Sequence, residues 1–78
     1  MVSYEKAQEL RDDAAKRLDA AIARLRETNA DRPSLEELAA AIGDAAIAEQ
    51  HIRLPAKMHD DLTRARQLMS FLASPMGP

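Results

Sequence analysis

The chain has 78 residues, no cysteine and a net charge of −2, and 46% of its residues are hydrophobic, 31% charged and 3% aromatic. This length allows a single domain, and the lack of cysteine excludes disulfides and thiolate metal sites. No apolar run approaches the ~20 residues of a membrane span, and the first residues lack the basic start and apolar core of a signal peptide. We therefore expect one cytoplasmic domain, residues 1–78, that does not enter a membrane.

The first predicted helix covers about residues 4–28. Apolar residues such as Leu10, Leu18 and Leu25 recur there at three- and four-residue steps and form one stripe. Ser3 can cap its start. The segment from Asn29 to Pro33 breaks the periodicity and predicts a short loop.

The second predicted helix covers about residues 34–53. Ser34 and Glu37 fit a capping box, which predicts that the helix begins at Ser34. Between Leu38 and Ala48 the segment is apolar on nearly every side, so we expect it to be the central packing element, covered from at least two directions. Gly43 leaves three possibilities open: a close contact, a kink or a true turn.

The third predicted helix covers about residues 55–73, with Pro55 at its first position. A seam of apolar residues repeats there at steps of four and three, and two further apolar residues widen it. The seam is Met58, Leu62, Ala65, Met69 and Leu72, and the widening residues are Leu68 and Phe71. Residues 74–78 are expected to form a flexible tail.

Three helices and no predicted strand give an all-α protein. It is expected to be a three-helix up-down-up bundle, or a helical hairpin whose third helix completes its core on another subunit. Sixteen of the hydrophobic residues are alanines, and the only aromatic residues are Tyr4 and Phe71. Because such small side chains bury little area, we expect a homo-oligomer.

One alternative function is DNA binding. The segment Leu35-Glu-Glu-Leu-Ala-Ala-Ala-Ile-Gly43 resembles the first helix and turn glycine of a helix-turn-helix, which implies that the residues after Gly43 read the major groove. However, residues 33–54 carry four carboxylates against the single Arg53, a net charge of −3. DNA affinity comes largely from basic side chains at phosphates, so the charge argues against nucleic acid as a partner.

A second alternative is an enzyme. The pieces Leu10-Arg-Asp-Asp and Arg17-Leu-Asp-Ala-Ala-Ile22 resemble the first helix of the small all-helical chorismate mutases. That family binds its dicarboxylate substrate through arginines on the first helix and a lysine after a glycine on the second. The resemblance implies a role for Arg11, but the first lysine after Gly43 is Lys57. We predict no enzyme activity.

Metal and cofactor sites are not predicted either. The potential ligands lie near the junction of the second and third helices and are Glu49, His51, His59, Asp60 and Asp61. On a helix, residues two positions apart, such as Glu49 and His51, point in different directions, so we interpret the group as surface residues.

The remaining hypothesis is a protein–protein interaction module, an adaptor or inhibitor of a larger protein, that acts through apolar faces of the second and third helices. The predicted partner-binding residues are Ile47, Leu68, Phe71 and Leu72. These faces are expected to pair with a second copy of the chain. The acidic net charge favours a basic patch on the larger partner.

Overall fold

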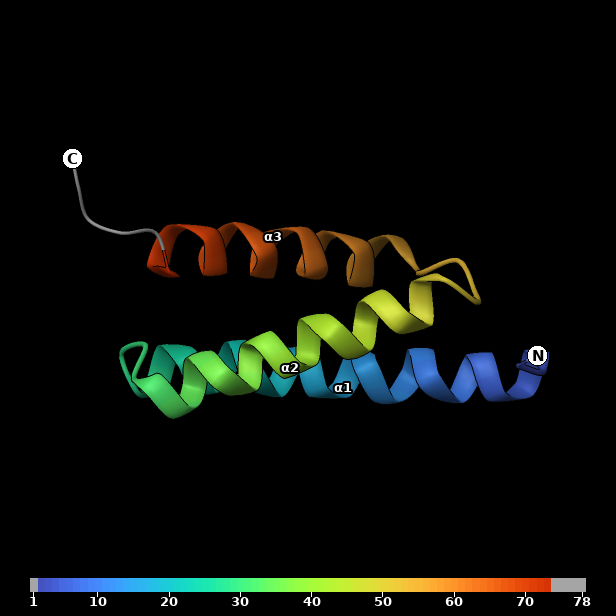
Figure 1. The fold of residues 1–78 in the computed structure, drawn as a ribbon, viewed down its shortest axis with the longest axis horizontal. Helices are drawn as coiled ribbons and strands as arrows, with labels where there is room; N and C mark the ends of the chain where they lie inside the picture. Colours follow the sequence, from blue (N-terminus) through green and yellow to red (C-terminus); the bar gives the residue numbers. More distant parts are fainter. Residues whose placement is uncertain (1, 74–78) are drawn as a thin grey trace.

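The computed structural model describes residues 2–73 and contains three helices there: α1 (Tyr4–Glu27), α2 (Arg32–Glu49) and α3 (Ala56–Ala73). Figure 1 shows α1 and α2 as an antiparallel hairpin, with α3 returning along one side of it. No strand occurs in the described residues, so the predicted all-α class is confirmed. The predicted tail at 74–78 lies outside them. Within residues 2–73, none of the helices has the length and apolarity to cross a bilayer.

The contact between α1 and α2 is close because most of it is made by alanine. Buried residues recur on both helices mainly at steps of four and three, which places them in facing stripes. They are Ala7, Ala14, Leu18, Ala21 and Leu25 on α1, and Ser34, Leu38, Ala41, Ala45 and Ala48 on α2. Side chains that end at Cβ let two helix backbones approach closely. The hairpin is thus the most tightly packed part of the molecule.

As expected for the central packing element, α2 is covered from two directions, by α1 and by α3, but its remaining face is in solvent. Ala39, Ala40 and Gly43 are exposed, and Ile47 keeps 49% of its surface accessible. Alanine favours helix even where it is not buried, so an alanine-rich run does not by itself indicate a helix buried all round. The helix contacts both α1 and α3 but uses only part of its circumference to do so.

The start of α2 also differs from the prediction. Asp31, not Ser34, is the N-cap, and its Oδ1 accepts a hydrogen bond from the Ser34 backbone N–H at 3.0 Å. Pro33 can follow a cap because the first turn of a helix has no use for its backbone N–H. Ser34 is fully buried in the first turn, with its hydroxyl 2.5 Å from that of Thr28. Glu37 forms an ion pair with Arg24 at 3.4 Å, so the predicted capping box does not form.

Hydrogen bonding at this cap changes the acidity of Asp31. The hydroxyl and backbone N–H of Ser34 stabilise the carboxylate, and Thr28 and the charge of Arg24 add to this, so the pKa of Asp31 lies below its ordinary value.

The loop between α1 and α2 is tight. Asn29 and Ala30 both have left-handed backbone angles, with φ of 55° and 62°. The Ala30 N–H donates to the Leu25 carbonyl at 2.9 Å, which closes the end of α1.

Gly43 lies inside a continuous helix. α2 runs through it without a break, its φ is not positive, and a Cβ placed there would have no neighbour within 4 Å. It is therefore neither a turn nor a close contact within residues 2–73. The helix ends at Glu49, four residues before the predicted end at Arg53, and residues 50–55 form the connection to α3.

α3 packs more loosely on the hairpin than the two helices of the hairpin pack on each other. Met58, Leu62 and Ala65 are buried, which confirms the first part of the predicted seam. Lys57, in the first turn of α3, forms an ion pair with Asp19 of α1 at 3.6 Å and donates a hydrogen bond to Asp61 of its own helix at 2.9 Å. The hydrogen bond to Asp61 contributes most to raising the pKa of Lys57, and the negative charge of Asp19 adds to it.

Candidate functional site

The candidate site is an apolar groove between the end of α1 and the C-terminal half of α3. We call it the α1–α3 groove. Its apolar lining consists of Ile22, Leu25 and Ala30 from α1 and the loop, and Leu68 and Leu72 from α3. Its volume of about 300 Å³ lies at the lower limit of pockets that enclose a small molecule, ~300–1,000 Å³. Its shape therefore suits a few side chains of a partner better than a whole ligand.

The groove exists because burial decreases along α3. Ala65 is fully buried, whereas Leu68 is only partly buried and Leu72 keeps 37% of its surface exposed. Phe71 is 78% exposed. It follows Arg64 by seven residues, two helical turns, so both side chains project from the same edge of α3. The most exposed large apolar side chain in residues 2–73 therefore stands on the edge of α3 that borders the groove.

The structure brings together three of the four residues predicted to bind a partner. Leu68 and Leu72 line the α1–α3 groove, and Phe71 stands beside it. Ile47 is elsewhere: it follows Asp44 by three residues, on the edge of α2 where Asp44 pairs with Arg17 of α1. The groove along that edge has no lining residue from α3. Ile47 thus belongs to a separate surface.

Two arginines that are not among the predicted partner-binding residues also line the α1–α3 groove. They are Arg26 from α1 and Arg64 from α3. Within the described residues, no carboxylate lies at ion-pair distance from either guanidinium, whereas Arg17, Arg24 and Arg66 all pair with acidic residues of α2. The sequence holds one signal for this, since α3 contains no acidic residue after Asp61. The groove is therefore basic although the chain as a whole is acidic.

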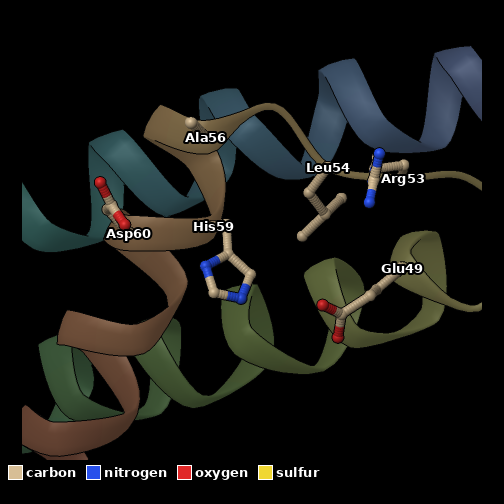
Figure 2. Close-up of a pocket in the computed structure, with 6 residues that line it drawn as sticks. All are labelled: Glu49, Arg53, Leu54, Ala56, His59 and Asp60. Carbon is tan, nitrogen blue, oxygen red and sulfur yellow. The ribbon is translucent and has the colours of Figure 1, made fainter.

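A second, more polar pocket of about 680 Å³ lies at the junction of α2 and α3. Figure 2 shows Glu49 and His59 turned toward the same space beside Leu54, while the carboxylate of Asp60 points away. His51 does not line this pocket, and Asp61 bonds Lys57 on another face. In the described part of the chain, no group of three or more potential ligands could hold a metal ion.

The structure lacks the features that the helix-turn-helix and chorismate mutase resemblances imply. α2 continues through Gly43, so the turn that a helix-turn-helix needs at that position is not formed. The structure does bring Arg11 and Lys57 together, in a separate pocket between the N-terminal part of α1 and the start of α3 and not in the α1–α3 groove. However, Arg11 lies 3.1 Å from Asp12, and Lys57 is held by Asp19 and Asp61. These carboxylates occupy the positive groups that a dicarboxylate substrate would need.

Comparison of the chain with protein-family models, with curated proteins and with solved structures found no significant match.

Proposed function

We propose that this protein is a small interaction module, an adaptor or inhibitor, that binds another protein through the surface formed by Leu68, Phe71 and Leu72. The observation that carries the proposal is the 78% exposure of Phe71 beside the half-covered Leu72 and an apolar groove. Fully burying a phenylalanine side chain contributes roughly 1.5–3 kcal/mol, so covering the exposed part of Phe71 would contribute about 1–2 kcal/mol before the costs of association.

Exposed aromatic residues next to a pocket are typical anchors of protein interfaces, because most of the binding energy comes from a few such residues. The homo-oligomer predicted from the sequence is one way to cover this surface, since two copies could bury Phe71 and Leu72 against each other. Ile47 stays a predicted contact on a separate face of α2. We expect the protein to act in the cytoplasm.

The experiment compares wild type with Phe71→Gln. Both would be measured by light scattering over a hundredfold concentration range, and both would be immobilised to capture binding proteins from an extract of the source cells. Glutamine keeps helix propensity and adds no charge, so we expect unchanged helicity and loss of self-association or capture.

Tyr4→Gln is the matched control, because Tyr4 is the other aromatic residue and is 69% exposed on the first turn of α1. This variant should behave like wild type. If Phe71→Gln also behaves like wild type in mass and in capture, the α3 surface does not bind a partner and the proposal is wrong.

A further inference from the structure

The charges at the α1–α3 groove indicate which kind of partner fits it. Arg26 and Arg64 come from the two helices that form the groove, so a cation stands on each of these helices beside the apolar lining. Both lack an acidic partner in residues 2–73. A ligand that brings carboxylates to them would form ion pairs without breaking any pair already made.

We propose that the α1–α3 groove binds an amphipathic helix of a partner protein whose apolar stripe is flanked by acidic residues. This inference rests on the proposed function and specifies its partner. The apolar stripe would cover Leu68 and Leu72, as in helix-in-groove recognition. Carboxylates on its flanks would reach Arg26 and Arg64. The partner is therefore acidic at this site, although the net charge of −2 by itself favours a basic one.

A second copy of the chain is a poorer occupant. In a two-fold symmetric dimer each copy presents the same patch to the other. Arg26 and Arg64 of both copies would then lie around one interface, and like charges brought together oppose association. A nucleic acid could neutralise the two arginines, but its phosphates would leave Leu68, Phe71 and Leu72 uncovered.

The test uses fluorescently labelled helical peptides and the 78-residue chain. Three peptides share one leucine stripe at positions i, i+3, i+4 and i+7 and differ only in having Glu, Gln or Lys on its flanks. Two exposed ion pairs contribute modestly, so wild type should bind the Glu peptide roughly 2- to 30-fold more tightly than the Gln peptide, with the Lys peptide weakest. The preference should shrink in 0.5 M salt, where the Debye length is only ~4–5 Å.

Charge reversal tests the assignment directly. The double variant Arg26→Glu/Arg64→Glu should invert the order, so that the Lys peptide binds best. The control Lys16→Glu/Arg53→Glu changes the net charge equally at two exposed bases outside the groove, and it should keep the wild-type order. The inference is overturned if the groove variant keeps the wild-type order, if the three peptides bind wild type equally, or if none binds.

The outcomes separate this inference from the proposed function. Equal binding of all three peptides that Leu72→Gln abolishes would leave a protein-binding surface without acidic selectivity, so only the inference would fail. A mass that doubles with concentration and is changed by Arg26→Glu/Arg64→Glu would assign the groove to a second copy. Binding of a DNA or RNA oligonucleotide that the same variant abolishes would assign it to nucleic acid. The Phe71→Gln measurements decide the proposed function independently.

Discussion

Replacing Gly43 by alanine should stabilise the protein. Gly43 lies in the interior of α2 with its φ outside the left-handed region, and a Cβ there would meet no atom within 4 Å. The added methyl group therefore removes backbone freedom from the unfolded chain without creating a clash. The helix propensities of the two residues differ by about 0.8–1.0 kcal/mol. With an unfolding entropy of roughly 2.1 cal/mol/K per residue, a gain of ~1 kcal/mol raises the Tm by about 6 °C.

The assay is thermal and urea unfolding followed by far-UV circular dichroism. Ala39→Gly is the reciprocal control, because Ala39 is also exposed on α2, and it should lower the free energy of unfolding by a similar amount. If Ala39→Gly behaves as expected while Gly43→Ala is neutral or destabilising, the reasoning is refuted. Gly43 would then meet another backbone, either in a turn or across an interface between chains.

Two further predictions concern the core and the α2 cap. Leu38→Ala removes a fully buried side chain and should lower the free energy of unfolding, measured in urea titrations, by about 3 kcal/mol. Phe71→Gln at an exposed position should change it by less than about 0.5 kcal/mol. Similar values for the two variants would contradict this difference in burial. The pKa of Asp31 lies below its ordinary value of 3.8, so its ionised form stabilises the fold above that pH, and this contribution is lost as the pH falls through the lowered pKa. Asp31→Asn keeps an N-cap acceptor but removes the titratable carboxyl group, so the difference in unfolding free energy between wild type and variant should shrink below pH ~3.8. A difference that does not change with pH would show that Asp31 does not act through its charge.

The sequence by itself determined the all-α class and the three helices, because a helix and its apolar periodicity depend on residues three and four positions apart. The buried seam of Met58, Leu62 and Ala65 follows directly from that pattern. The helix ends were less well predicted. The capping-box pattern predicted Ser34 as the cap of α2, whereas Asp31 caps the helix and the Ser34 hydroxyl contacts that of Thr28 in the folded hairpin.

The candidate site was predicted only in part. The sequence predicts Leu72 in the apolar seam of the third helix and Leu68 and Phe71 on its flank, and the structure places all three at or beside one groove. Ile47 was predicted to bind the same partner, but it lies on another face of the molecule, because α2 and α3 present their exposed apolar residues in different directions. Alanine content also overstated burial, since an exposed alanine costs little and the outer face of α2 needs no cover.

Only the tertiary structure decided the charge of the groove. The net charge of −2 and the −3 of residues 33–54 both describe the chain as acidic. The fold places most of the bases on α1 and α3 beside carboxylates of neighbouring turns and helices, but it leaves Arg26 and Arg64 at the groove without one. Ion pairing between helices depends on which helix faces come within a few ångströms of each other, and that distance is set by packing between segments that are remote in sequence.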